Sequence, residues 1–306
     1  MWAKHKRFNS NASSSQGFTI VELLIVIIVI GILAAITIVA YNGVQSRAQV
    51  SAVSSALTQA AKKIALWQVD NPNRVPTNLS GVGVIDSENV NYQYTVTGPS
   101  SYCLMAAAGS TFYKVTESAP ASAGGCTITN LMANPSFESN TTGWGNTLTT
   151  IERMTGSAPV GSAYLRIARN ATGDAYVPFT IPGNPPANTP YTLSYWIWAD
   201  TNVSLASDLL FRTNNNGSCC ASIATKSAQA VTTTPTRVVM SGTTGSNPTS
   251  GLQIILRPTI TIGQNIYYDG FMVTYGSFTP NYADGSYPDW SWGGTVNNSA
   301  SSGLAI

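Results

Sequence analysis

A single acidic side chain lies inside a long apolar segment near the N-terminus. Residues 17–40 read GFTIVELLIVIIVIGILAAITIVA, and Glu22 is the only charged residue among them. An unpaired carboxylate in hydrocarbon costs about 2.5–3.5 kcal/mol at the centre of a membrane, and somewhat less near its surface. Glu22 therefore predicts a cationic partner in the surroundings that this segment enters.

Other reactive residues are few, and they argue against an enzyme. His5 is the only histidine and precedes the apolar segment, so a Ser-His-Asp triad, a Cys-His pair or a histidine-ligated zinc site is excluded beyond it. The four cysteines form a separated pair, Cys103 and Cys126, and an adjacent pair, Cys219 and Cys220. An even number in an exported chain favours disulfides, and neither pair has zinc-knuckle spacing. We expect one bridge between Cys103 and Cys126, with two free thiols as the alternative, and leave Cys219 and Cys220 as either a bridge or two thiols.

The elements that position Glu22 begin with a helix over residues 18–70. Residues 18–40 would reach about 34 Å, enough to cross a membrane, and the basic, acid-free residues 1–17 would stay in the cytoplasm. Beyond residue 40 an apolar stripe continues at helical spacing until Asn71-Pro72 ends the helix. The stripe comprises Val50, Val53, Leu57, Ala60, Ala61, Ile64 and Trp67. Because no small domain buries a helix this long, its first half must pack against lipid and then against other copies.

The remaining chain reads as β-structure in two parts, which makes the expected fold class α+β. Residues 71–128 contain three short β-type runs separated by turn residues, and predict a small antiparallel sheet packed on the helix stripe. Residues 129–285 contain short alternating runs between Gly-, Pro- and Asn-rich turns, the pattern of a β-sandwich. Residues 286–306 are a tail in which Trp290 and Trp292 alternate with small residues and would either lie across a sheet edge or be presented to partners. We expect most of the remaining tail to be disordered.

The segment Gly17-Phe18-Thr19-Ile20-Val21-Glu22 resembles the processing motif of type IV prepilins. The resemblance implies cleavage of leader 1–17 after Gly17 by a prepilin peptidase, and N-methylation of Phe18. It also implies that Glu22 pairs with the Phe18 amine of a neighbouring subunit while a helical filament assembles. The alternatives are a signal anchor whose glutamate reaches the membrane surface, or a secretory signal cut at Ala34-Ala35.

The sequence NLMANPSFESNTTGW, from Asn130, resembles the start of carbohydrate-binding-module-like jelly rolls. That resemblance implies a structural calcium ion held by Glu138 and Asp269. It also suggests a glycan-stacking platform of Trp196 and Trp198, which share one face of the run 191–199. The alternative, which we favour, is that these tryptophans pack beneath a loop or a crossing strand.

The expected function is structural: a type IV pilus subunit that displays the jelly roll for adhesion or surface binding. Expected partners are other copies of the chain, prepilin peptidase, the pilus assembly machinery, the membrane before assembly, and a glycan or host surface. Nucleic acid is not expected, because loss of Lys4, Lys6 and Arg7 takes the formal net charge from +2 to −1. The chain would be a single-pass inner-membrane precursor and then part of an extracellular pilus. Alternatives are a minor pilin or adhesin whose jelly roll binds glycans, and a pseudopilin of a type II secretion or DNA-uptake system.

Overall fold

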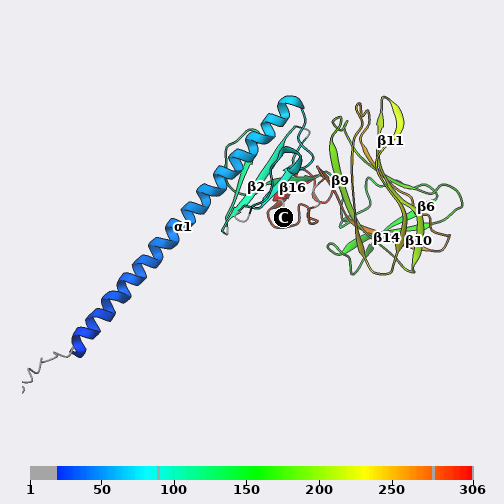
Figure 1. Ribbon diagram of the computed structural model, residues 1–306. Helices are drawn as coiled ribbons and strands as arrows, with labels where there is room; N and C mark the ends of the chain where they lie inside the picture. The colour runs from blue at the N-terminus through cyan, green and yellow to red at the C-terminus, as the bar shows by residue number, and fades with distance from the viewer. Residues whose placement is uncertain (1–18, 88–89, 99, 110, 278–279, 305–306) are drawn as a thin grey trace, which may run out of the picture. The chain divides into compact units, whose positions relative to one another are not determined.

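The computed structural model describes residues 19–304, except 88–89, 99, 110 and 278–279. Gly17 and Phe18, the predicted processing residues, lie outside the described residues. The chain divides into two compact units, residues 1–50 and 51–306, which we describe separately. The helix α1 (Ile20–Asp70) runs unbroken through 51 residues and belongs to both (Figure 1).

The first unit consists of the apolar half of α1. Its large aliphatic side chains from Ile20 to Ile38 are exposed by 48–83%, and by length and composition the helix can cross a membrane. Soluble monomeric proteins rarely expose so large a contiguous apolar surface to water. This half of α1 therefore requires cover from lipid or from other protein chains.

The second unit begins with the rest of α1 and a small sheet. Val53, Leu57, Ala60 and Ile64 are buried, as the helical stripe predicts. The meander β1 (Tyr92–Val96), β2 (Tyr102–Ala108), β3 (Thr111–Thr116) and β4 (Ser122–Ala123) is antiparallel and has the order β1-β2-β3-β4. A short 3₁₀ helix, η1 (Ser80–Val82), lies in the loop before it. Gln68 of α1 donates to the carbonyl of Ser100 at 3.3 Å, which ties the helix to the β1–β2 turn.

The same unit contains a sandwich of two antiparallel sheets, which lies at the right of Figure 1. One sheet has the order β11-β10-β13-β8 and the other the order β12-β9-β14-β7-β6. From β7 to β14 each strand follows its predecessor into the opposite sheet, except in the hairpin β10–β11. That strand order defines a jelly roll, and with α1 it confirms the predicted α+β class. The strands are β6 (Thr149–Thr155), β7 (Ala163–Arg169), β8 (Val177–Ile181), β9 (Pro190–Ala199), β10 (Val203–Asn215), β11 (Ser218–Val231), β12 (Thr236–Thr243), β13 (Leu252–Leu256) and β14 (Asn265–Tyr275).

The sandwich core contains one buried acid among its apolar side chains. Leu193, Tyr195 and Ile197 of β9 face inward, as the alternation of that run predicts. Asp208 of β10 is buried beside them and accepts hydrogen bonds from the hydroxyls of Tyr195 and, at 2.6 Å, Tyr268. Burial raises the pKa of Asp208, although the two tyrosine hydroxyls oppose the shift. The core thus encloses a group whose charge is costly.

Trp290 and Trp292 lie in a strand at the edge of a sheet, one of the two arrangements predicted for them, whereas the prediction that most of the remaining tail is disordered is wrong. β15 (Trp290–Trp292) and β16 (Ser301–Leu304) form a three-stranded sheet with β5 (Thr127–Asn130), in the order β15-β16-β5. The ring of Trp290 lies against Gly303, where a Cβ would overlap it. Its indole nitrogen donates to the carbonyl of Leu304 at 3.1 Å. Pairing with the edge of β5 and burial of Trp290 outweigh the high Gly and Ser content of the tail.

Candidate functional site

Glu22 lies in the first turn of α1 and is bonded to Thr19. The Thr19 backbone nitrogen and hydroxyl each donate to Glu22 Oε2 at 2.8 Å, and the Glu22 nitrogen donates to Thr19 Oγ1 at 3.2 Å. This reciprocal pattern is a capping box, which satisfies backbone donors that the start of a helix leaves unpaired. The Thr-x-x-Glu signal is visible in the sequence, but our sequence analysis missed it. Glu22 therefore has a role within its own chain, besides the partner expected from a neighbour.

The cysteines form two disulfides. Cys103 of β2 and Cys126 are bonded, with their Cα atoms 5.7 Å apart, and both side chains are buried. This bridge joins the meander to the strand β5 that leads into the jelly roll. Cys219 and Cys220, adjacent on β11, are bonded to each other and exposed. Arg212 Nη1 donates to Cys220 Sγ at 2.8 Å.

Glu138 and Asp269, the expected calcium ligands, are both bonded to backbone nitrogens. Glu138 Oε1 accepts from the nitrogens of Ser162 at 2.9 Å and Ala163 at 3.0 Å. Asp269 is 0% exposed and accepts from the nitrogens of Val160 at 2.9 Å and Gly270 at 2.7 Å. Glu138, in the segment between β5 and β6, thus contacts the start of β7 and the residue before it, and Asp269 of β14 contacts the loop that precedes β7.

A third acid, Asp284, belongs to the same neighbourhood. The pKa of Asp269 is raised to about 8, mainly by burial and to a smaller extent by the charges of Glu138 and Asp284, while the hydrogen bonds from the backbone of Val160 and Gly270 oppose the shift. Asp284 is buried and accepts from the Tyr282 hydroxyl at 2.6 Å and the Ser136 hydroxyl at 3.2 Å. No sequence signal distinguished Asp284 from other acids.

The donors fit a hard cation such as calcium only in part. Carboxylate oxygens are the ligands that calcium prefers, and a cation would relieve the repulsion among the three buried or half-buried acids. Among the described residues, however, no three metal-binding side chains lie close enough together to hold an ion by themselves. Glu138 and Asp269 would need backbone carbonyls or water to complete a coordination shell.

Trp196 and Trp198 lie on the outer face of the five-stranded sheet, and both are largely covered. Trp198 is 8% exposed and stacks on Tyr267 with ring centres 5.4 Å apart, while Tyr164 meets it edge-on at 5.0 Å. Trp196 packs against the cluster that contains Tyr282 and Trp290. This arrangement favours the packing interpretation over an open stacking platform.

A cavity of about 270 Å³ lies on the outer face of the other sheet. Leu210 and Ile255, directly opposite each other in the β10–β13 register, contribute apolar side chains to its lining. Sequence analysis missed it, because its residues come from three separate stretches of the chain. The lining consists of Asp174, Tyr176, Leu210, Arg212, Ile255 and Arg257.

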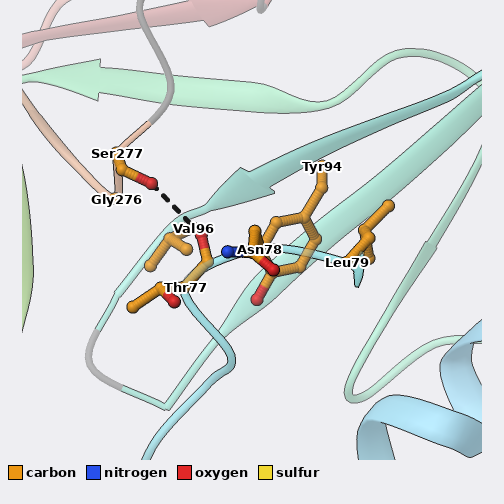
Figure 2. Close-up of a pocket in the computed structure, with 7 residues that line it drawn as sticks. All are labelled: Thr77, Asn78, Leu79, Tyr94, Val96, Gly276 and Ser277. Carbon is orange, nitrogen blue, oxygen red and sulfur yellow. Dashed lines mark hydrogen bonds between the residues drawn. The ribbon is translucent and has the colours of Figure 1, made fainter. Parts of the chain in front are cut away.

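A second cavity, of about 240 Å³, lies beside β1 (Figure 2). The Ser277 hydroxyl donates to the Thr77 carbonyl at 3.1 Å across it, the bond dashed in Figure 2. The Tyr94 hydroxyl donates to the carbonyl of Pro76 at 2.9 Å. None of the residues that line it carries a charge at neutral pH, so this cavity offers no evident chemistry. Its lining is Thr77, Asn78, Leu79, Tyr94, Val96, Gly276 and Ser277.

Comparison with known proteins identifies the N-terminal part of the chain. Residues 12–38 match the model of the prokaryotic N-terminal methylation motif. The type IV wide pilus major component PilA4 of Thermus thermophilus is 35% identical over 97 residues, which cover 30% of this chain and 73% of that protein. A fimbrial protein of Neisseria meningitidis is 37% identical over 79 residues, 26% of this chain and 46% of that protein. The chain belongs to the type IV pilin family.

Solved structures that resemble the chain at low similarity include several carbohydrate-binding domains. The CBM22-1 xylan-binding domain of Paenibacillus barcinonensis Xyn10C has 15% identity and a TM-score of 0.38, covering 51% of this chain and 97% of that one. The N-terminal cellulose-binding domain of Cellulomonas fimi β-1,4-glucanase C has 18% identity and a TM-score of 0.37, covering 47% and 95%. The assignment of the sandwich as a jelly roll rests on its own strand order.

Proposed function

We propose that the chain is a structural subunit of a type IV pilus that displays its jelly roll on the filament. The observation that carries this proposal is the apolar half of α1, whose aliphatic side chains are 48–83% exposed and need cover. Before assembly the membrane would supply it, and in the filament the helices of other copies would. Burial stabilises by about 25 cal/mol per Å² of apolar surface, so packing many long helices offsets extraction from lipid. The proposal gives the chain no catalytic role.

In this proposal prepilin peptidase cleaves after Gly17, and the pilus assembly machinery then extracts the helix from the inner membrane. Glu22 pairs with the amine of Phe18 on a neighbouring subunit, which fixes the axial register. A buried acid opposite a buried cation offsets part of the desolvation of both, whereas either one alone is strongly destabilising. Glu22 would thereby fix the register between neighbouring subunits more than it would add to the net stability of the filament.

Immunoelectron microscopy of sheared surface filaments, with an antibody to the jelly roll, tests this proposal. We expect label along the whole filament, as for a major subunit. Label at the tips only would replace the proposal with a minor pilin or adhesin. Absence of surface filaments, with the protein retained in the envelope, would replace it with a pseudopilin.

The jelly roll is proposed, second, to bind a glycan or host surface. The observation that favours this is the cavity on the four-stranded sheet, which combines apolar side chains, a tyrosine and two arginines. Trp196 is half-buried and Trp198 is buried, so this proposal places the binding surface at the cavity. A glycan array probed with the detergent-solubilised full chain tests this function, and an array without hits would overturn it.

Calcium is proposed as a structural ion held by Glu138 and Asp269. It would neutralise the buried charges and clip the first and last parts of the jelly roll together. The midpoint temperature of thermal unfolding of the full chain should rise when calcium is added and return to its original value when calcium is chelated. D269N should abolish the shift, while D70N, at an exposed acid on α1, should keep it. An unfolding temperature of the wild-type chain that is the same with and without calcium would overturn the proposal.

A further inference from the structure

The cavity on the four-stranded sheet presents two guanidinium groups beside an apolar surface. Arg212 lies on β10, and Arg257 directly follows β13, the next strand of the same sheet. A guanidinium binds carboxylates through a planar fork of donors and stays charged at every physiological pH. Two such groups at one cavity point to an anionic ligand.

Arg212 is held in place by the strands on either side of it. Its Nε donates to Gln253 Oε1 of β13 at 2.9 Å, and its Nη1 donates to Cys220 Sγ of β11 at 2.8 Å. The side chain is therefore fixed across three neighbouring strands. Because its fork is already ordered, a ligand carboxylate would bind without the usual loss of side-chain entropy.

Arg257 forms an ion pair with Asp174 that a ligand could exchange. Their side chains are 34% and 69% exposed, respectively. An ion pair this exposed contributes about 0–1 kcal/mol. A carboxylate on the ligand could therefore take the place of Asp174 at little cost.

The apolar part of the lining fits the face of a sugar ring. Leu210 and Ile255 lie opposite each other across the strand pair, and Tyr176 adds an aromatic ring. Because Ile255 is 6% exposed, the half-buried Leu210 and Tyr176 supply most of the open apolar surface. Carbohydrate rings carry apolar C–H faces and hydroxyl rims, so they match apolar and aromatic surfaces flanked by polar groups. The cavity volume of about 270 Å³ suits one sugar unit of a chain crossing the sheet.

The charge of the site limits how anionic that ligand is. Two arginines and one aspartate leave a single net positive charge, and the exposed Asp174 would repel a densely charged polymer such as nucleic acid or polyphosphate. One carboxylate per sugar unit balances the site. We propose that this cavity binds a carboxylate-bearing polysaccharide, which rests on the proposed glycan-binding function. Arg212 and Arg257 face the carboxylate. The sugar ring lies against the apolar side of the lining, which consists of Leu210, Ile255 and Tyr176.

Calorimetry with the full chain in detergent tests the proposal. The probes are polygalacturonate, its fully methyl-esterified form with the same backbone, and polyglutamate. We expect binding to polygalacturonate, with affinity lower by about ten- to a hundredfold for the ester, since the charge-assisted hydrogen bonds are lost. Similar binding of both polysaccharides would overturn the acidic class, and equal binding of polyglutamate would replace it with an acidic peptide.

Substitutions locate the site. R212Q and R257Q should each weaken binding of polygalacturonate about tenfold or more, and D174N should strengthen it, because the competing acid is removed. K62Q, which removes a charge from the exposed face of α1, should leave it unchanged. Unaltered unfolding temperatures show that the variants fold. Wild-type affinity in both arginine variants would overturn the proposal, and so would binding to none of the probes.

Failure of this proposal is distinguishable from failure of the function on which it rests. Neutral glycans that bind on an array, with R212Q and R257Q unaffected, would leave glycan binding intact and refute the acidic ligand. No binding of any glycan would refute both. Filament assembly is expected to be unchanged in R212Q and R257Q.

Discussion

Three variants at the start of α1 separate the two roles of Glu22. E22A removes both the helix cap and the negative charge. E22Q keeps the cap, since glutamine serves as well as glutamate in a capping box, but removes the charge. T19V keeps the charge and the side-chain shape, and loses the two hydrogen bonds that involve Thr19 Oγ1.

The two roles differ in expected size. Loss of a helix cap costs about 1 kcal/mol, a factor of about five in an equilibrium constant. Leaving the Phe18 amine unpaired in the interior of a filament costs about 3–5 kcal/mol, a factor of about 10²–10³ or more for each subunit. T19V should therefore form filaments in slightly reduced amounts, whereas E22Q and E22A should both fail to form them.

The assay compares surface-sheared protein with protein in the membrane fraction by immunoblotting. All three variants should reach the membrane at wild-type levels, because the apolar segment is intact. Normal filament yield from E22Q would refute the proposed ion pair. Loss of filaments in T19V as complete as in E22A would show instead that the capping box is the essential feature.

Three further predictions concern the second unit. Because burial raises the pKa of Asp208, the folded state keeps a proton that the unfolded state has released, so the free energy of unfolding should fall as the pH rises above about 4, by up to about 1.4 kcal/mol per pH unit. In urea unfolding at about pH 4 and about pH 7, D208N should lose less stability between the two pH values than wild type. Equal losses in the two proteins would refute this. C126S, which opens a bridge with a sequence separation of 23, should lower the free energy of unfolding by about 3 kcal/mol in urea, and a change below about 1 kcal/mol would contradict the estimate. G303V should expel Trp290 and increase its fluorescence quenching by acrylamide relative to S302V, whose side chain is exposed.

The features that sequence analysis predicted are those set by local patterns. The spacing of Val53, Leu57, Ala60 and Ile64 gave the buried stripe, because a helix repeats within a few residues. Alternation in β9 likewise identified its inward-facing side chains. The position of Glu22 in a processing motif indicated the pilin family, which the similarity to known pilins confirms.

The features that it missed depend on which segments meet. Leu210 and Ile255 line one cavity only because β10 pairs with β13, which lies about 40 residues away in the chain. The tail is ordered because Trp290 packs against Gly303 and β16 pairs with β5. Neither contact follows from a pattern of neighbouring residues in the sequence. Asp284 joins Asp269 for the same reason. Such contacts follow from topology, which short-range patterns leave open.

Mass spectrometry of the N-terminal peptide from surface-sheared protein tests the central claim most directly. The chain found on the cell surface is predicted to begin at Phe18 and to carry one methyl group on its terminal nitrogen. Such a peptide would show that the leader is removed and that the processed chain is exported with Glu22 four residues from the new terminus. A surface chain that retains residues 1–17, or one cut near Ala34-Ala35, would contradict the assignment as a processed pilin.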